Sequence, residues 1–364
     1  MKQRTRFDKI LFFAVLILAV FGVIMIYSAS SIWAEYKFND AFRYLKYQGI
    51  FFVVGTFLMW YVSKIDYHIY KKKSNLLLLI CVILLVLVLI PGIGTVRNGS
   101  RSWFGIGSLG IQPSEFTKLA LIIFVAKYLS NNRKEVRDIK KGVLPILGVT
   151  MLVFGIIMLQ PDFGTGVIIV MSIVALLFTS GVDLSFFVKI GMVGMVGVVG
   201  LIIAAPYRLK RILSFLNPWQ DPLGSGFQII QSLYAIGPGG ILGLGFGNSI
   251  QKHFYLPEPQ TDFIFSIISE EFGFLGIVIV TALFLTIIIR SFQIALKCED
   301  LFAKYLVYGI IFQFSFQTLL NLMVVVGLIP VTGVTLPFLS YGGSSLLITM
   351  ASIGIILNIS RSHS

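Results

Sequence analysis

Long apolar runs separated by short polar segments recur along the whole 364-residue chain. An α-helix needs about 20 residues to cross a hydrocarbon core of ~30 Å at 1.5 Å per residue, and these runs have that length. The pattern predicts an all-α polytopic membrane protein with about ten transmembrane helices. The predicted spans are residues 10–31, 47–63, 75–91, 113–130, 143–160, 164–181, 184–206, 263–290, 305–328 and 342–358.

The composition agrees with this pattern, since 57% of the residues are hydrophobic, 12% are charged and the mean hydropathy is +0.91. A soluble domain does not need so much apolar surface, whereas a bilayer absorbs it. The first run follows a basic segment, and Ser28-Ala29-Ser30 resembles a signal-peptide cleavage site. Because many spans follow, we expect an uncleaved first helix. Residues 1–364 are therefore expected to form a single integral membrane domain.

The distribution of basic residues predicts the orientation of the chain. The formal net charge is +13, and about 18 of the 29 lysines and arginines lie at the two termini or in loops on the same predicted side as the termini. By the positive-inside rule both termini are cytoplasmic, in a bacterial plasma membrane. Topology and anionic lipid explain these charges, because the basic residues flank apolar runs instead of forming one patch for nucleic acid.

With this orientation, the three segments richest in glycine, proline and polar residues, 92–112, 207–262 and 329–341, lie outside. Segment 207–262, between spans seven and eight, is too long for a simple connector, so we expect a large structured extracellular loop. Within it, the spacing over residues 227–236 predicts a short amphipathic helix in the outer interface. The following glycine-rich run lacks a nucleotide-binding pattern and predicts turns and close packing.

Asp262, at the entrance to the eighth span in LPEPQTDFIFSIISEE, has two interpretations. Thr261 or Asp262 is a good N-cap for the following helix, which would also keep the carboxylate pKa low. Alternatively, a partly desolvated carboxylate at the outer surface is a candidate general base. On a helix, Asp262 would share a face with Ser266 and Ser269.

Glu115 and Lys118 are the next candidates, at the outer start of the fourth span after Pro113, which suits a first helical position. Their i, i+3 spacing allows an ion pair. This pair either holds helices together or lines a charged cavity, and ionisable groups within spans are candidate sites because they are costly there.

Further cations and polar groups are predicted on the outer face. Arg101 and Trp103 occur in NGSRSWF, directly after Arg97, and Arg208 and Arg211 occur in YRLKR. Arginine side chains can extend to lipid headgroups, or they can bind the phosphates of a substrate, whose oxygens match the guanidinium fork.

Other polar residues have structural interpretations, except for two in the predicted short helix. Gln231 and Ser232, on the polar side of the helix over 227–236, are candidates for substrate contact. Asp162 is expected in a turn or cap, with direct involvement as the alternative. The adjacent acids Glu270 and Glu271 are expected in a structural network.

Gln317 and Asn321, four residues apart in the ninth span, are expected to form hydrogen bonds between helices. The chain has only two cysteines and three scattered histidines. These numbers give no support for a disulfide framework or a histidine-rich metal site.

Five motifs in series identify a resemblance to a known family. The motifs NGSRSWF with IQPSEFTKLA, QPDFGTG, APYRLKRILSFLNPWQDPLGSGFQIIQSLYAIGPGG, LPEPQTDFIFSIISEEFGFLG and GLIPVTGVTLPFLSYGGSS resemble the SEDS family (shape, elongation, division and sporulation). The resemblance runs over essentially the whole chain and in order. Because the family members share these motifs, they do not distinguish sporulation from vegetative division.

The resemblance implies a peptidoglycan glycosyltransferase that polymerises lipid II outside the membrane, with a class B penicillin-binding protein as partner. It places the essential aspartate of the family at Asp262, its cavity charge pair at Glu115 and Lys118, and its outer arginine and tryptophan at Arg101 and Trp103. The cofactor is unassigned, with Mg2+ or Mn2+ as candidates.

In the corresponding mechanistic hypothesis, Asp262 accepts a proton from the acceptor sugar hydroxyl. Lys118, Arg101 and Arg208 or Arg211 offset charge on the departing undecaprenyl pyrophosphate. A lipid II flippase and a non-catalytic scaffold for the penicillin-binding protein are the alternatives. The clustering of polar motifs on one side favours the enzyme, because a carrier should present comparable groups to both sides.

Overall fold

The computed structural model describes residues 7–97, 99–106, 109–136, 138–203, 209, 213–224 and 226–362. In this part of the chain, one long helix coincides with each predicted span, and α6 and α7 are separate helices. These helices are α1 (Lys9–Phe38), α2 (Arg43–Val62), α3 (His68–Leu87), α4 (Pro113–Asn131), α5 (Leu144–Met158), α6 (Phe163–Thr179), α7 (Leu184–Ile203), α10 (Ile264–Lys297), α11 (Leu301–Val325) and α12 (Gly343–Ser362).

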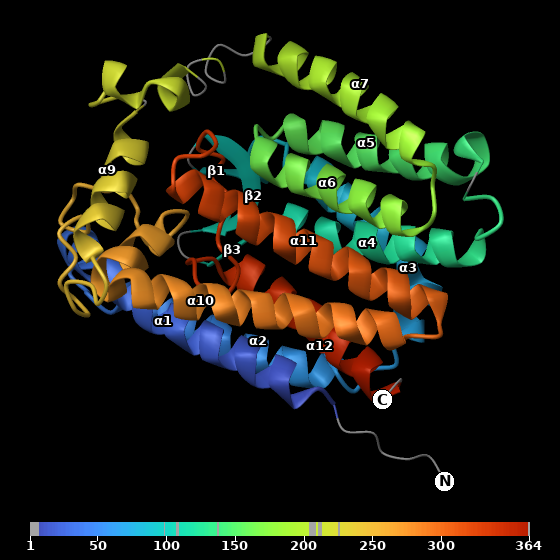
Figure 1. Ribbon diagram of the computed structural model, residues 1–364, viewed down its shortest axis with the longest axis horizontal. Coiled ribbons are helices and arrows are strands. Elements are labelled where there is room, and N and C mark those ends of the chain that lie inside the picture. The colour runs from blue at the N-terminus through green and yellow to red at the C-terminus, as the bar shows by residue number, and fades with distance from the viewer. Residues whose placement is uncertain are drawn as a thin grey trace.

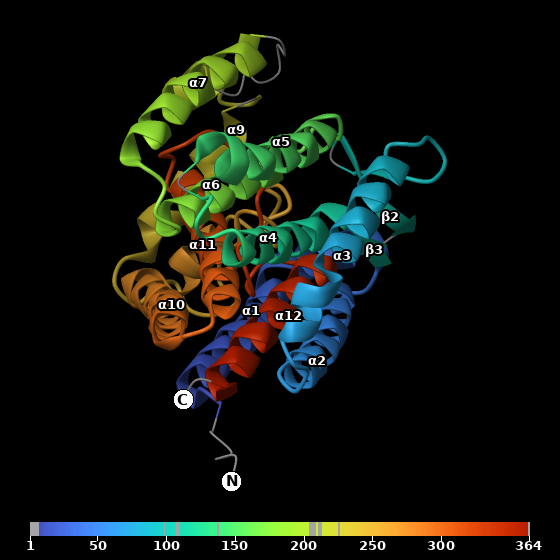
Figure 2. The ribbon, with the colours of Figure 1, turned by 90° about the vertical axis from the view of Figure 1, so that its right-hand side faces the viewer.

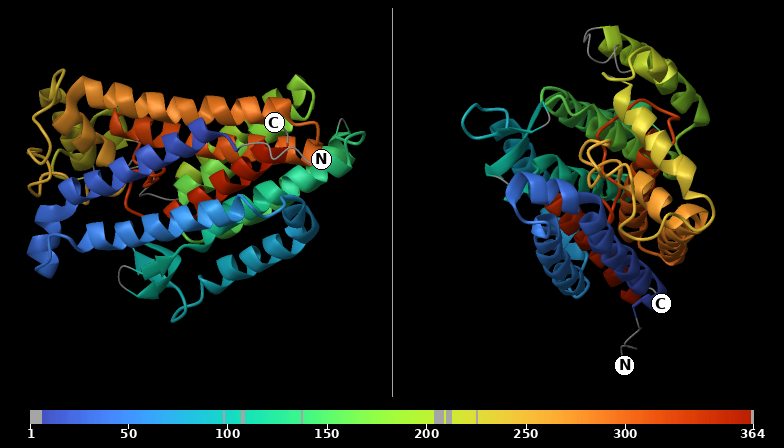
Figure 3. Two further views of the ribbon diagram at one scale, coloured as in Figure 1. Left: turned by 90° about the horizontal axis from the view of Figure 1, so that it is seen from below. Right: turned by 90° about the vertical axis from the view of Figure 1, so that its left-hand side faces the viewer.

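The long helices form an elongated bundle (Figures 1 and 3). By length and composition, six of the described helices can cross a membrane, namely α1, α2, the helical stretch Ile139–Met158, α10, α11 and α12. The helices α4, α11 and α12 occupy the centre, and α11 packs against α4, α6 and α10. Helix α7 lies at the edge and packs against α6 (Figure 2), with apolar side chains such as Val196 exposed on its surface.

The two ends of the bundle differ in content. Helix α1 starts and helix α12 ends at one end, on the right of Figure 1. The three segments rich in glycine and proline gather at the opposite end, with α9 and the strands (Figure 1). This arrangement agrees with an even number of spans and brings the segments that carry the described candidate residues toward one end of the molecule.

A small antiparallel sheet differs from the all-helical prediction. Its strands β1 (Thr95–Arg97), β2 (Ser100–Ile106) and β3 (Leu109–Ile111) are arranged in the order β1-β2-β3. They occupy the first of the glycine-rich segments, where positive φ at Gly99 permits the turn between β1 and β2. The strands have at most seven residues, and they lie in a segment that the sequence marked only by its glycine, proline and polar residues.

The long segment before α10 contains the predicted amphipathic helix. Helix α9 spans Phe227–Ile236, as the residue spacing indicated, and is flanked by the 3-10 turns η2 (Pro218–Gln220) and η3 (Gly237–Gly239). A π-helical turn, η1 (Ile139–Val143), precedes α5. Residues 240–262, the glycine-rich loop, run from η3 to the start of α10 as turns and irregular chain, which confirms the prediction of turns.

Candidate functional site

The predicted pair Glu115 and Lys118 forms a buried ion pair at the start of α4. Pro113 is the first residue of this helix, as predicted, and the Nζ of Lys118 lies 2.8 Å from Oε1 of Glu115. The side chain of Lys118 is 2% exposed and that of Glu115 is 7% exposed. Lys118 also donates to Oε1 of Gln317 over 2.9 Å. The charge pair is therefore held at the interface of α4 and α11.

Asp162 adds a second carboxyl to this cluster. It caps α6, as predicted, because its side chain accepts from the backbone amide of Thr165, and its Oδ2 also accepts from the side-chain Nε2 of Gln112 over 3.2 Å. Burial raises the pKa of Asp162, while the hydrogen bonds from Thr165 and the charge of Lys118 act in the opposite direction. The spacing of the sequence gave no sign that this turn lies beside the charge pair.

Helix α11 connects the charge pair to the segment that carries Asp262. Gln317 accepts from Lys118 and donates to the carbonyl of Thr335. One turn away, Asn321 donates to the carbonyl of Asp262 over 2.7 Å and also to that of Val334. Residues four apart on a helix are separated by ~6 Å along its axis. The predicted hydrogen bond between helices is thus confirmed for Gln317, whereas Asn321 bonds to carbonyls of two loops. Together the two residues link the candidate centres.

Asp262 precedes α10 and lies outside the helix. The helix begins at Ile264 with Phe263 in the N-cap position, so the prediction that Thr261 or Asp262 is the N-cap is wrong. The expected helical face with Ser266 and Ser269 is wrong for the same reason. The hydroxyl of Thr261 donates to Oδ1 of Asp262 over 2.9 Å. The fold of the preceding loop, and not the geometry of a helix terminus, therefore sets the position of this carboxylate.

Buried polar atoms without a hydrogen-bond partner in the described structure occur beside these residues. They include Oγ of Ser114, Oε1 of Gln260 and Oδ1 of Asn321. Burial of an unpaired polar group is unfavourable, so such atoms are suited to a polar ligand. They lie next to Glu115, near Asp262 in the chain, and on the helix between the two centres.

Arg101 and Trp103 lie on β2, within the small sheet. Arg101 extends toward the end of α3, where its guanidinium donates to the carbonyl of Leu89 over 3.4 Å. The guanidinium of Arg97 lies 4.8 Å from the ring centre of Trp103. The sheet itself contacts the turn that leads to Asp162, because the hydroxyl of Ser100 donates to the carbonyl of Gln160. By these contacts, Arg101 and Trp103 belong to the support of the site.

The remaining predicted residues are distributed differently. Arg208 and Arg211 lie outside the described residues. Ser232 is fully buried, and its hydroxyl contacts Ser266 of α10 and donates to the carbonyl of Val325. It therefore fastens α9 to α10 and α11, while Gln231 beside it is partly exposed.

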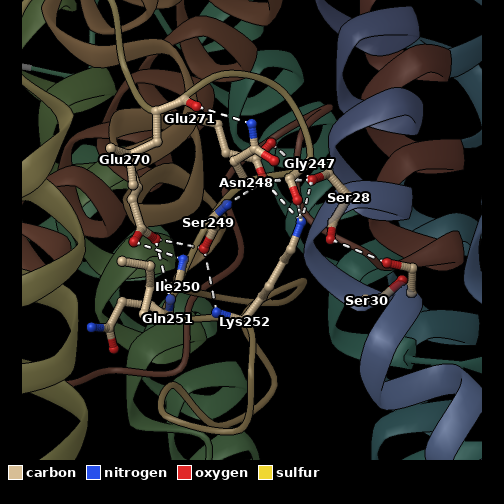
Figure 4. Close-up of polar contacts among 12 residues, drawn as sticks. Ser28, Ser30, Gly247, Asn248, Ser249, Ile250, Gln251, Lys252, Glu270 and Glu271 are labelled. Atoms are coloured by element: carbon tan, nitrogen blue, oxygen red, sulfur yellow. Dashed lines mark hydrogen bonds and ion pairs between the residues drawn. The ribbon is translucent and has the colours of Figure 1, made fainter.

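The two acids Glu270 and Glu271 form the predicted network (Figure 4). Both are fully buried, and their carboxylates contact residues 249–252 of the glycine-rich loop. Lys252, which the sequence pattern did not distinguish, is 5% exposed and pairs with Glu271 over 3.2 Å. No periodic signal marks a lysine in an irregular loop, so only the folded loop shows this pairing.

The described residues do not form an evident cation site. No group of three or more Asp, Glu, His or Cys side chains among them could hold a metal ion. Divalent cations prefer several oxygen ligands, mainly carboxylates. In this part of the chain a site made of protein side chains alone is therefore not evident, whereas Mg2+ can also be held by one or two carboxylates together with substrate phosphates.

Comparison with known sequences gives a match over nearly the whole chain. The profile of the FtsW, RodA and SpoVE family, described as cell cycle proteins, matches residues 8–364. Stage V sporulation protein E of Bacillus subtilis (strain 168) is 52% identical over 359 residues, which are 99% of this chain and 98% of that protein. A probable peptidoglycan glycosyltransferase FtsW of Trichlorobacter lovleyi is 44% identical over 97% of this chain and 93% of its own length.

Solved structures share the fold over the same extent. A chain from a study of polymerization and crosslinking by a peptidoglycan synthase complex aligns with a TM-score of 0.80, 32% identity and 98% coverage of both chains. The rod shape determining protein RodA of Thermus thermophilus aligns with a TM-score of 0.73 and 28% identity, covering 98% of this chain and 97% of that one.

Proposed function

The chain belongs to the family of FtsW, RodA and SpoVE, and from this membership we propose that it polymerises lipid II into glycan strands. It is a multi-pass membrane protein and a peptidoglycan glycosyltransferase. The reaction joins sugars and releases undecaprenyl pyrophosphate. Within this function, Asp262 is the general base, and the Glu115–Lys118 pair lines the binding site.

One observation supports these roles above the others: the ion pair of Glu115 and Lys118 is buried, and the partly exposed carboxyl of Asp162 interacts with it electrostatically. Glu115, Lys118 and Asp162 form one cluster, and α11 links it to the segment of Asp262 through Gln317 and Asn321. Ionisable groups in such surroundings are costly and typically serve a function. The unpartnered atoms of Ser114, Gln260 and Asn321 add hydrogen-bonding capacity for a sugar or a phosphate.

In the proposed step, the carboxylate of Asp262 accepts the proton of an acceptor sugar hydroxyl. The hydroxyl oxygen then attacks the anomeric carbon of the donor strand, and the bond from that carbon to the pyrophosphate oxygen breaks. The ammonium of Lys118 faces negative charge that grows on the leaving group. Glu115 and Gln317 fix the position of this ammonium before the reaction, which avoids reorganisation during it.

Polymerisation by the purified chain tests this assignment. Purified wild type and Asp262→Asn would be incubated with lipid II, and the products separated by gel electrophoresis. We expect glycan polymer from the wild type and a loss of at least about 100-fold in rate from the variant, as typical for removal of a general base. Equal polymerisation by a normally folded variant would refute the role of Asp262.

The same material distinguishes the alternative functions. Translocation of lipid II across liposomes without polymer formation would indicate a flippase. An unchanged activity of a complex after loss of Asp262, combined with sensitivity to changes on lipid-facing helices, would indicate a scaffold. The partner for such experiments is a class B penicillin-binding protein, because a structural relative belongs to a peptidoglycan synthase complex that couples polymerization and crosslinking.

We further propose that both termini face the cytoplasm and that Asp262 faces the outside. The excess of basic residues on the side of the termini supports this orientation. The position of α9, the sheet and the glycine-rich loop at the end opposite the start of α1 and the end of α12 agrees with it (Figure 1). The site then opens where lipid II presents its sugars.

A further inference from the structure

Helix α10 is interrupted at Gly273, and the glycine-rich loop inserts at the interruption. Gly273 has φ 61° and ψ −155°, which separates a short first part, residues 264–272, from the remainder of the helix. The carbonyls of Glu270 and Glu271 accept from the amides of Leu244 and Gly245. In a continuous helix they would accept from residues 274 and 275.

The amides on the other side of the interruption also bond to the loop. Phe274 donates to the carbonyl of Gly240 over 2.9 Å, and Leu275 donates to that of Ile241 over 3.1 Å. The loop therefore replaces the backbone partners that the interruption removes, as required for a broken helix within a membrane protein. The first part of α10 is thus bonded to the loop at its C-terminal end, residues 270 and 271.

The side chains of the two acids hold a later part of the same loop (Figure 4). The carboxylate of Glu270 accepts from the amides of Ile250 and Gln251 and from the hydroxyl of Ser249. The carboxylate of Glu271 accepts from the amide of Ser249 and from Lys252.

Lys252 completes this contact with three acceptors for its ammonium. Its Nζ lies 3.2 Å from Oε1 of Glu271 and 3.3 Å from Oγ of Ser28 on α1, and it also donates to the carbonyl of Gly247. The hydroxyl of Ser28 donates to the carboxylate of Glu271 over 2.6 Å. The buried ammonium is thus fully hydrogen-bonded, and it ties the loop to both α1 and α10.

These contacts close residues 249–271 into a ring that contains Asp262. One side of the ring is the loop from Ser249 to Asp262, and the other is the first part of α10. Because both ends of the segment 249–271 are fixed to each other, fewer positions are available to the carboxylate of Asp262. Correct orientation of a reacting group is a large part of catalysis, and a displacement of 1 Å can cost about 100-fold in rate.

We infer that Lys252 and Glu271 are positioning residues, which act on the reaction by fixing the loop that carries Asp262. This inference rests on the proposed function of Asp262. Lys252 contacts Glu271, Ser28 and the carbonyl of Gly247, whereas Lys118 contacts Glu115 and Gln317, so the effect of Lys252 and Glu271 passes through the loop.

The double variant Lys252→Met/Glu271→Gln tests this role without leaving an unpaired buried charge. Each replacement is close in size to the original side chain, so folding is expected to persist. We expect kcat for lipid II polymerisation to fall about 10- to 100-fold, while KM changes by less than about threefold, because ground-state binding groups are unaltered. The matched control is Lys46→Met, because Lys46 pairs with Asp40 at an exposed position. This variant is expected to retain the wild-type kcat.

A second measurement follows the loop directly. Spin labels at Lys46→Cys and Tyr255→Cys, which replace exposed side chains, report the distance from α2 to the loop, while the native Cys81 and Cys298 are buried. We expect the distance distribution to broaden in the double variant and to remain narrow in the parent protein.

The outcomes separate the two hypotheses. A wild type that makes no polymer refutes the proposed function. An active wild type with a folded double variant of unchanged kcat, or of unchanged label distance distribution, refutes the positioning role alone. An increase in KM at constant kcat would also refute it, because the residues would then serve binding.

Discussion

Lys118 can remain buried because protein groups replace its water. Its ammonium has an ion pair with Glu115 at 2.8 Å and a hydrogen bond to Gln317 at 2.9 Å, and its side chain is 2% exposed. Loss of one member of such a pair leaves an uncompensated charge, whereas loss of both can be nearly neutral for stability. This asymmetry separates a structural role from a functional one.

We expect Lys118→Met to destabilise the protein by about 3 kcal/mol, because Glu115 would retain its buried charge. The double variant Glu115→Gln/Lys118→Met should recover most of this stability but polymerise lipid II at least about tenfold more slowly than wild type. Thermal unfolding and initial rates on the same samples measure the two effects. If the double variant regains both the stability and the polymerisation rate of the wild type, the pair is structural only.

Asp162 gives a pH-dependent prediction at the same scale. Burial raises its folded pKa, so the stability contributed by the protonated form is present at low pH and is lost as pH rises through that pKa. Asp162→Asn keeps an N-cap side chain and carries no charge. We expect the variant to melt about 1 to 3 °C higher than wild type at pH 7.

This difference should shrink as the pH falls toward 4, near the ordinary pKa of a carboxyl group at about 3.9. Thermal unfolding of detergent-solubilised protein across this range provides the measurement. A variant that is less stable than wild type at pH 7 would contradict the prediction.

At the scale of elements, α10 consists of two helical parts joined by a special glycine. Gly273 has a positive φ, and a Cβ at this position would lie 2.5 Å from the amide nitrogen of Gly243 and 2.7 Å from the carbonyl oxygen of Gly239. The same glycine therefore permits both the interruption of the helix and the close approach of the loop. The hydropathy of the run 263–290 contains no sign of this interruption, because glycine is common in membrane helices.

We expect Gly273→Ala to destabilise the protein by about 3 kcal/mol, from backbone strain and steric overlap together. The matched control is Gly148→Ala on α5, where a Cβ would meet nothing within 4 Å. That change should be neutral or stabilise by about 1 kcal/mol. Yield and thermal unfolding of the two purified variants test the difference, and equal stability would show that the loop tolerates a side chain at the interruption.

At the scale of the whole molecule, the bundle separates its two ends. Asp8 at the start of α1 pairs with Arg290 near the end of α10, and the amide of Asp8 donates to Ser360 near the end of α12. The opposite end holds α9, the sheet and the glycine-rich loop (Figures 1 and 3). One end is thus closed by charged contacts between helices, and the other carries the candidate site.

We expect alkaline phosphatase to be active when inserted after Leu223, an 89% exposed residue of the long loop, and inactive when fused after the C-terminal residue. The enzyme matures only outside the cytoplasm, where disulfides form. A C-terminal fluorescent protein, which folds in the cytoplasm, is the complementary control. The reverse pattern would invert the orientation and place Asp262 inside.

Within the described residues, the sequence alone determined where the long helices and the short helix over 227–236 lie, and it determined the motifs of the family. It did so because membrane insertion imposes long uniform apolar runs, and a helix satisfies its own backbone within one segment. For the same local reason, the spacing of Glu115 and Lys118 predicted their ion pair, and the cap at Asp162 was predicted from its turn.

Only the tertiary structure decided how these pieces meet. The interruption at Gly273, the burial of Lys252 against Glu271 and Ser28, and the approach of Asp162 to Lys118 depend on segments distant in sequence. Periodicity reports local preference, whereas these contacts depend on which loop replaces which backbone partner in three dimensions. Asp262 likewise lies before the N-cap of α10, in the loop that these contacts fasten to α1 and α10.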